Sequence, residues 1–528
     1  MKKESIYAFL LVLLSWINQT PASFAQDASE LKIDPLMMIS LKECRHITGI
    51  IGDELFHGWD FKSTPVLFYR PNVQELLFNY PHRPKGFSDY TGFNPLNEKK
   101  IYVRNGATTI LYDDQNTSVE IDSISVLVVA DPFSTMRNQL NDILGRPRDI
   151  SDQWLTNWQF IPDPYYQVEV MLHEAFHVFQ HKKAPDKYAD ESVVLHYPLL
   201  DPENNALYVM EGNILRDALL TRQPESRIEA IKKFVAVRTY RQSRLDSSWV
   251  EYENLNEFQE GLAKYVEYKF KQLGEGIKPI NEMYYHQGFN GYHSVLSKKF
   301  KEAIDNMVNI VAVNDNRFGN KFGSGPLRFK LYDLGACEAL LLDEVMPQWK
   351  ERIFEPNVYL TDLLKQSLRL TPDEQKRYLE MAKTEYKYDT AYQSKLEFEI
   401  EGNKKIEEKV ASILKTQKTL VRISYDGLNQ KARIQRYTPF GVTQISKQSV
   451  IYEMVPILVY FKKGSIIDFK QAVPVIVDQD KKQLFFSVDT PPSKFVSDNP
   501  NKLELNEFSL TSPMDIHFED NIVSIQLK

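Results

Sequence analysis

The sequence predicts an α+β fold with a small N-terminal sheet, a mainly helical central region and a C-terminal antiparallel β-domain. Three stretches indicate this order. Residues 26 to about 135 mix short apolar runs with turns, residues 137–385 show mainly helical periodicity, and strand-like runs between turn signals occupy residues 401–528. The chain of 528 residues is also too long for one hydrophobic core, because domains average roughly 150 residues. We therefore expect a region of helices and sheet over 26–400 and a β-rich domain after it.

The first 25 residues have the pattern of a secretory signal peptide. Two lysines precede the apolar run Phe9–Leu14, and Ser23–Ala25 forms a small-residue cleavage site. A membrane span needs about 20 apolar residues, whereas this run is short and is interrupted at Trp16 and Asn18. We expect cleavage after Ala25 and a secreted or periplasmic chain without stable membrane insertion; an uncleaved N-terminal anchor is the alternative.

The composition argues against a disordered, a fibrous and a nucleic-acid-binding protein. The chain is 43% hydrophobic and 26% charged, as in ordinary globular proteins, and its net charge of −7 does not favour a nucleic-acid partner. Its two cysteines, Cys44 and Cys337, are so far apart that spacing does not establish whether they form a disulfide. Cys337 lies in an apolar helical run, which favours a buried thiol. The sequence does not indicate an oligomeric state.

The N-terminal region contains two clear strand candidates, Pro65–Tyr69 and Ile124–Ala130, each closed by a turn with proline. In the central region, the segment Pro224–Leu245 is helical and rich in basic residues, which we expect on a solvated face. Beyond residue 400, a charged helix precedes strand-like runs, of which the clearest are Thr419–Ile423, Val455–Phe461 and Leu484–Val488.

The strongest helix prediction covers Tyr166–Lys182. Its apolar residues recur at a 3.6-residue period, Asp163-Pro164 supplies an N-cap and a first-turn proline, and Pro185 follows its end. This helix carries His173-Glu174-Ala175-Phe176-His177. Histidines four residues apart project from one side of a helix and suit two corners of a zinc site. A glutamate after the first histidine can act as the base that deprotonates a metal-activated water. The alternative is a helix with two hydrogen-bonded histidines.

Catalytic zinc takes three protein ligands, so a third ligand is required. His181 continues the spacing, but one straight helix cannot place three successive turns around one ion, so we expect it to flank the site. A second predicted helix, from an N-cap at Asn256 to Gly274, offers Glu260 beside small residues that let another helix approach. Glu211, followed by Gly212, is the rival ligand. Solvated helix positions are expected for three other glutamates, Glu253, Glu257 and Glu267.

His173-Glu174-x-x-His177 followed by Glu260-Gly261-Leu262-Ala263 resembles the gluzincins, the zinc peptidases typified by thermolysin and aminopeptidase N. Relatives of aminopeptidase N carry the third ligand in an Asn-Glu-Gly-aromatic-Ala segment, where this chain has Gln259 and Leu262 at the first and fourth positions. The glycine turn and later histidine of the metzincins are absent. The resemblance implies a zincin-like catalytic domain that binds one zinc ion through His173, His177 and Glu260.

Gluzincins also carry a Tyr-x-x-Gly-Ala segment, and Tyr332-Asp333-Leu334-Gly335-Ala336 matches it downstream of Glu260. The resemblance implies that Tyr332 stabilises the oxyanion of the tetrahedral intermediate. Packing is the other interpretation of Tyr332, and Arg328 is the other candidate electrophile. By the same analogy Ile124–Ala130 is the edge strand that pairs with an extended peptide, although an ordinary buried strand fits as well.

This chain also departs from the family. About 80 residues separate His177 from Glu260, so extra helices must lie between the two ligand segments. The Gly-x-Met-Glu-Asn segment that recognises the substrate amine in aminopeptidases is absent. The resemblance spans about 170 residues and does not cover 400–528.

The leading hypothesis is an exported zinc metallopeptidase in which Glu174 and Tyr332 are the catalytic residues and a peptide or protein is the substrate. One alternative is a non-catalytic exported zincin-like scaffold whose C-terminal β-domain binds a protein or glycan. Another is a zinc hydrolase that acts on a non-peptide bond. The sequence does not indicate cleavage specificity or distinguish an exopeptidase from an endopeptidase.

Overall fold

The computed structural model describes residues 29–106, 116–144, 155, 162–313, 321–415, 417–428, 430–437, 441–461, 464–496 and 499–528. The expected signal peptide and its cleavage site lie outside these residues. None of the described helices has the length and apolar character needed to cross a membrane. Contacts divide the chain into two compact units, one with residues up to Ile39, Pro65–Asn116 and Val128–Phe160, the other with Ser40–Thr64, Thr117–Leu127 and Ile161–Lys528.

An N-terminal sheet has six strands in the order β3-β4-β2-β1-β6-β5. Its strands are β1 (Val66–Arg70), β2 (Gln74–Phe78), β3 (Ser88–Asp89), β4 (Ile101–Asn105), β5 (Thr117–Ile121) and β6 (Ile124–Ala130). Both predicted strands are therefore confirmed, as β1 and β6. Of the two interpretations of Ile124–Ala130, the edge strand is wrong and the ordinary buried strand is confirmed, because β6 lies between β1 and β5 and most of its residues are buried. The short turn Asp122-Ser123 returns the chain as a hairpin and makes β5 the end strand.

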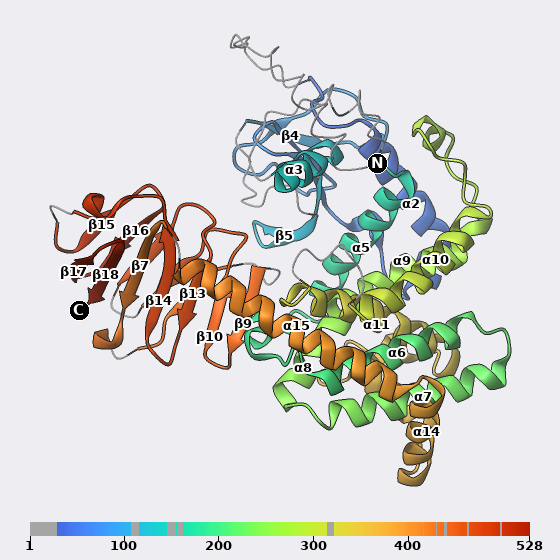
Figure 1. Ribbon diagram of the computed structural model, residues 1–528. Helices are drawn as coiled ribbons and strands as arrows, with labels where there is room; N and C mark the ends of the chain where they lie inside the picture. Colours follow the sequence, from blue (N-terminus) through green and yellow to red (C-terminus); the bar gives the residue numbers. More distant parts are fainter. Residues whose placement is uncertain are drawn as a thin grey trace, which may run out of the picture. The chain divides into compact units, whose positions relative to one another are not determined.

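Most helices lie between the two sheet regions of the chain, but one of them, α2 (Leu36–Leu55), precedes the first strand in a stretch where the sequence did not predict a helix (Figure 1). They are α2 (Leu36–Leu55), α3 (Pro132–Leu144), α5 (Pro164–Lys183), α6 (Pro202–Leu220), α7 (Pro224–Gln242), α8 (Ser247–Asn256), α9 (Leu262–Leu273), α10 (Val295–Val311), α11 (Gly325–Val345), α12 (Trp349–Arg352), α13 (Leu360–Leu368), α14 (Pro372–Glu385) and α15 (Tyr388–Leu414). Shorter helical turns include η3 (Glu191–His196), η5 (Gly274–Gly276) and the π-helical turn η4 (Glu257–Gly261).

Helix α5 begins and ends where the sequence predicts. The carboxylate of Asp163 accepts hydrogen bonds from the backbone N–H groups of Tyr165 and Tyr166, and Pro164 occupies the first turn. The apolar face of α5 packs into an aromatic cluster, where the ring of Phe176 lies 4.9 Å from that of Phe56 and 5.4 Å from that of Trp59. This packing fixes the orientation of the opposite face, which carries the histidines.

Asn256 does not cap a helix, contrary to the sequence-based expectation. Helices α8 and α9 form one continuous rod through η4, and the backbone of Asn256 is helical, with φ −68° and ψ −39°. The N-cap lies ten residues earlier, at Asp246, whose side chain accepts a hydrogen bond from the backbone of Ser248. Gly274 ends the rod as expected.

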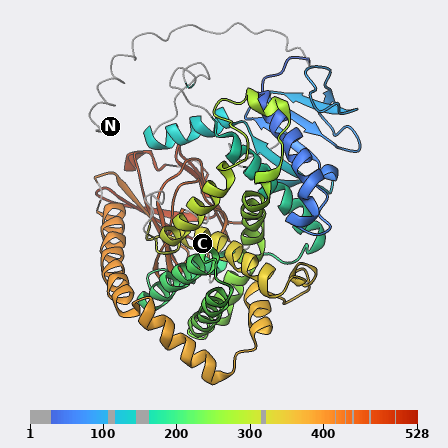
Figure 2. The ribbon, with the colours of Figure 1, turned by 90° about the vertical axis from the view of Figure 1, so that its right-hand side faces the viewer.

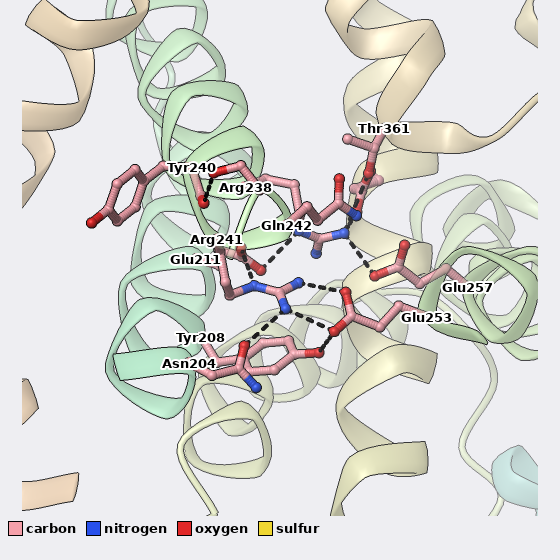
Figure 3. A network of polar contacts seen from close by, with 12 residues as sticks. Asn204, Tyr208, Glu211, Arg238, Tyr240, Arg241, Gln242, Glu253, Glu257 and Thr361 are labelled. Carbon is pink, nitrogen blue, oxygen red and sulfur yellow. Dashed lines mark hydrogen bonds and ion pairs between the residues drawn. The ribbon is translucent and has the colours of Figure 1, made fainter. Parts of the chain in front are cut away.

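The basic residues of α7 were expected in solvent, and this expectation is wrong for two of them. The side chains of Arg238 and Arg241 are completely buried. They pair with acidic residues of the surrounding helices (Figure 3). Arg238 contacts Glu257 at 2.8 Å and Arg241 contacts Glu253 at 2.8 Å, so these two glutamates are also buried rather than solvated. Glu211 and Glu338 complete the buried ion-pair network.

The C-terminal region forms two sheets over one hydrophobic core, to which β7, β12, β14 and β16 contribute Val421, Ile467, Phe486 and Phe508. One sheet has the order β17-β18-β7-β14-β13-β10-β9 (Figure 1), and the other has the order β15-β16-β12-β11-β8. The strands are β7 (Thr419–Ser424), β8 (Arg433–Arg436), β9 (Val442–Ser446), β10 (Ser449–Tyr452), β11 (Leu458–Tyr460), β12 (Ile466–Phe469), β13 (Val475–Asp478), β14 (Gln483–Val488), β15 (Lys502–Glu504), β16 (Phe508–Thr511), β17 (Met514–Glu519) and β18 (Ile522–Leu527).

Neighbouring strands of this region run antiparallel, as predicted, except that β18 and β7 pair in parallel. The expected boundary near residue 400 falls inside α15, the long orange helix of Figure 2. Ile413 of α15 packs against Ile451 and Ile476 of the larger sheet. Both cysteines, Cys44 and Cys337, are buried and free.

Candidate metal centre

Three side chains from two helical segments converge in the second unit. The Nε2 atoms of His173 and His177 lie 3.6 and 3.4 Å from the same carboxylate oxygen, Oε2 of Glu260. The three ligand atoms lie within 4.8 Å of one another. A tetrahedral ion with bonds of about 2.0–2.1 Å keeps its ligands about 3.3 Å apart. The spacing and the two-nitrogen, one-oxygen donor set therefore fit a metal ion with three protein ligands.

Both histidines are oriented by hydrogen bonds on the far side of their rings. The Nδ1 atom of His173 lies 2.8 Å from Oε1 of Glu267, and that of His177 lies 2.9 Å from Oε1 of Gln180. These oxygens can accept a hydrogen bond from the Nδ1–H group of each ring, so that the Nε2 atoms are the ones that face a ligand. Burial by itself lowers the pKa of His173, but the hydrogen bonds to Glu260 and Glu267 outweigh it and raise that pKa to about 10. The carboxylates thus give the site a strong preference for positive charge.

Glu260 is held in an ionised state and at a defined angle. Its second oxygen, Oε1, accepts a hydrogen bond of 3.0 Å from Arg328. Burial raises the pKa of Glu260, but the neighbouring histidines and Arg328 overcome this effect and hold the pKa well below its usual value. One oxygen is therefore anchored by a cation while the other faces both imidazoles.

A close helix contact explains the position of Glu260. A Cβ atom at Gly261 would lie 2.7 Å from the Cα atom of Gly335, and one at Gly335 would lie 2.7 Å from the backbone oxygen of Glu257. Only glycine permits this approach between η4 and α11. The expectation that small residues after Glu260 admit another helix is confirmed, and the other helix is the one that carries Tyr332.

Glu174 lies beside the triad and is half-buried. Burial raises its pKa, although the two histidines act in the opposite direction. Among the described residues, no side chain or backbone group makes a hydrogen bond or ion pair with its carboxylate. Because its pKa is raised and its oxygens have no hydrogen-bond partner among these residues, the carboxylate of Glu174 can accept a proton from another group.

Tyr332 and Arg328 both belong to the site. The ring of Tyr332 lies 6.3 Å from that of His173 at an interplanar angle of 26°. Arg328 lies 3.5 Å from the phenol oxygen through Nη2 and also pairs with Glu191 of η3. Burial and the charge of Glu260 raise the pKa of Tyr332, so its phenol keeps its proton and can donate a hydrogen bond.

Two residues considered from the sequence lie outside the triad. His181 faces away, as expected, with Nδ1 at 2.9 Å from the hydroxyl of Tyr188 and Nε2 at 3.2 Å from Glu120 of β5. Glu211 is fully buried and its two oxygens receive Arg238 and Arg241 at 3.0 and 2.7 Å (Figure 3). Glu211 therefore does not contribute to this centre.

Sequence reasoning missed the two groups that orient the histidines. Glu267 was expected in solvent, yet it is buried and also pairs with Lys264 at 2.6 Å. Its spacing of seven residues from Glu260 places both carboxylates on one face of a helix and is the signal that could have identified it. Gln180 follows His177 by three residues and so lies on the same side of α5.

Searches of protein-family models, curated proteins and solved structures find no match to this chain.

Proposed function

We propose that this chain is an exported zinc metallopeptidase with a gluzincin-like, zincin-type catalytic domain. The convergence of His173, His177 and Glu260, with the uncommitted carboxylate of Glu174 beside them, is the observation that supports the proposal most strongly. The expected signal peptide supports export to the periplasm or the exterior.

The donor set favours zinc among common metals. Two imidazole nitrogens and one carboxylate oxygen are typical ligands of catalytic zinc, which keeps a fourth position for water or substrate. Calcium and magnesium prefer sets made of oxygen atoms, and structural zinc sites use four protein ligands. Within the described residues, the three side chains form the group of potential ligands at this site.

The side chains of the site have separate tasks in peptide hydrolysis. A bound Zn²⁺ supplies a Lewis acid, which lowers the pKa of a coordinated water to about 7 and polarises a carbonyl oxygen. Glu174 accepts the proton of the attacking water and returns it to the amine that leaves. The phenol of Tyr332 donates a hydrogen bond to the carbonyl oxygen as negative charge develops there. Arg328 orients the phenol and, through Glu260, holds a ligand in place.

Strand β5 is suited to bind an extended substrate next to this site. It is the end strand of its sheet among the described residues, and Glu120 of β5 contacts His181 of α5. An end strand has backbone groups that can pair with a peptide. The gluzincin analogy assigns the pairing with an extended peptide to Ile124–Ala130, but β5 is better placed for this role.

The proposal is tested by a substitution of Glu174 that removes the general base but leaves the three metal ligands in place. Glu174→Gln should retain about one zinc per chain but lose hydrolysis of a mixed peptide library, because the three ligands remain. Glu397→Gln, at an exposed position on α15, is the matched control and should keep both properties. Full hydrolysis by Glu174→Gln would refute the mechanism, and a wild-type chain without zinc would favour the non-catalytic scaffold.

A further inference from the structure

We propose that Gln180 is a positioning residue that ties the second histidine of the metal centre to the turn that carries the glutamate ligand. The inference rests on the proposed zinc site and extends it to a residue that is not a ligand. It concerns the relative placement of His177 and Glu260, which come from separate helical segments.

The side-chain amide of Gln180 uses both of its ends. The residue is 2% exposed and lies on α5, three residues after His177. Its Oε1 atom lies 2.9 Å from Nδ1 of His177, while its Nε2 atom donates to the backbone oxygens of Phe258 at 2.7 Å and Gln259 at 3.1 Å. One amide therefore bridges a ligand of α5 and the main chain of η4.

These contacts determine the direction of the amide and the tautomer of the histidine. The backbone oxygens of Phe258 and Gln259 can only accept hydrogen bonds, so the amide nitrogen of Gln180 must face them. The amide oxygen must then face His177, whose Nδ1 must carry the proton. The Nε2 lone pair of His177 is thereby directed to the side where Oε2 of Glu260 lies, at 3.4 Å.

The position of the two accepted carbonyls explains why the bridge matters for the metal. Phe258 and Gln259 directly precede Glu260 in a π-helical turn. Such turns are rare, contain one residue more than an α-helical turn, and often occur at functional sites. The hydrogen bonds from Gln180 fix the position of this turn relative to α5. Loss of the bridge should therefore displace Glu260 from His177 rather than only loosen one ring.

The two histidines differ in how they are held. Glu267, the partner of His173, is a carboxylate on α9, and within the described part of the chain its hydrogen bonds go to His173 and Lys264 rather than to η4. Gln180 is neutral and adds no charge, so its contribution is geometric. Gln180→Glu would keep an acceptor for His177 but would place a negative charge against two carbonyl oxygens. Gln180→Glu therefore removes the hydrogen bonds to η4 while it keeps the one to His177.

The experiment measures zinc affinity by competition with a chelator of known affinity. Gln180→Met and Gln180→Glu should each weaken zinc binding by roughly 10–100-fold, the range for residues that orient metal ligands. Gln242→Met is the matched control, because Gln242 is also buried and hydrogen-bonded but lies on α7. This control should bind zinc as wild type does.

A double-mutant cycle distinguishes positioning from general stabilisation. In a Glu260→Gln background, Gln180→Met should weaken zinc binding by a clearly smaller factor, because the displaced turn no longer carries a carboxylate ligand. Unchanged affinity in Gln180→Met, or an equal loss in both backgrounds, would overturn the inference. If Gln180→Met does not fold, Gln180→Glu is used in the same cycle. Absence of zinc from the wild-type protein would instead refute the proposed function, and the inference with it.

Discussion

The contact between Gly261 and Gly335 offers a direct way to perturb the metal centre through helix packing. A Cβ atom at Gly261 would lie 2.7 Å from the Cα atom of Gly335 and 3.2 Å from the backbone nitrogen of Ala336. Carbon atoms in contact normally lie about 3.5–4.0 Å apart, so Gly261→Ala must separate the two backbones by about 1 Å. Because Glu260 precedes Gly261 and Tyr332 lies one turn before Gly335, this shift should weaken the metal site as well.

The size of the effect follows from two opposing contributions. Overpacking costs about 1–3 kcal/mol, and we expect about 3 kcal/mol here because the obstructing atoms are main chain and cannot rotate aside. Alanine in place of glycine in a helix recovers about 0.5–1 kcal/mol. The free energy of unfolding should therefore fall by about 2 kcal/mol, which lowers the melting temperature of a unit of this size by roughly 2–3 °C.

Thermal unfolding of the metal-free protein and chelator competition for zinc measure the two effects. The matched control is Gly276→Ala in η5, where an added Cβ would meet no atom within 4 Å. The control should unfold within about 0.5 kcal/mol of wild type and bind zinc unchanged. A Gly261→Ala variant as stable as Gly276→Ala, with wild-type zinc affinity, would show that this helix contact does not determine the metal site.

Three further predictions concern side chains of the site and of the buried network. Tyr332→Phe should lower kcat by roughly 100-fold or more without loss of zinc, since it removes only the phenol donor; an unchanged kcat would exclude Tyr332 from the reaction. Glu267→Gln should weaken zinc binding roughly tenfold in chelator competition, because His173 loses its anionic partner, and wild-type affinity would contradict this role. Burial raises the pKa of Glu338 and outweighs the opposing effect of Arg238. The stability contributed by Glu338 is thus present at low pH and lost as pH rises through the raised pKa. Glu338→Gln should therefore reduce the fall in melting temperature that follows as the pH rises above 4.5, the ordinary pKa of a glutamate, and identical profiles would refute this.

Local features made helix α5 predictable from the sequence. An aspartate cap, a first-turn proline and apolar residues at helical spacing all lie within about 20 residues, and each acts through neighbouring backbone groups. The strands β1 and β6 are recognisable for the same reason. The position of Glu260 followed from the small residues beside it, which signal a close helix contact even though they do not identify the partner helix.

Features that depend on distant partners were not predictable. Arg238 looks like a solvated residue of a basic helix, because its partners Glu211, Glu257 and Glu338 lie on other helices. The continuation of α8 into α9 through a π-helical turn contradicts the local capping signal at Asn256, since packing against α11 overrides it. The order of β5 and β6 also depends on tertiary pairing, so the end strand was assigned to the wrong segment.

Zinc content of the purified protein tests the central claim most directly. Wild type and the control His196→Ala, which changes an exposed histidine of η3, should each contain about one zinc per chain, whereas His177→Ala should contain almost none. Wild-type protein without stoichiometric zinc, or His177→Ala with as much zinc as wild type, would contradict a metal centre formed by His173, His177 and Glu260.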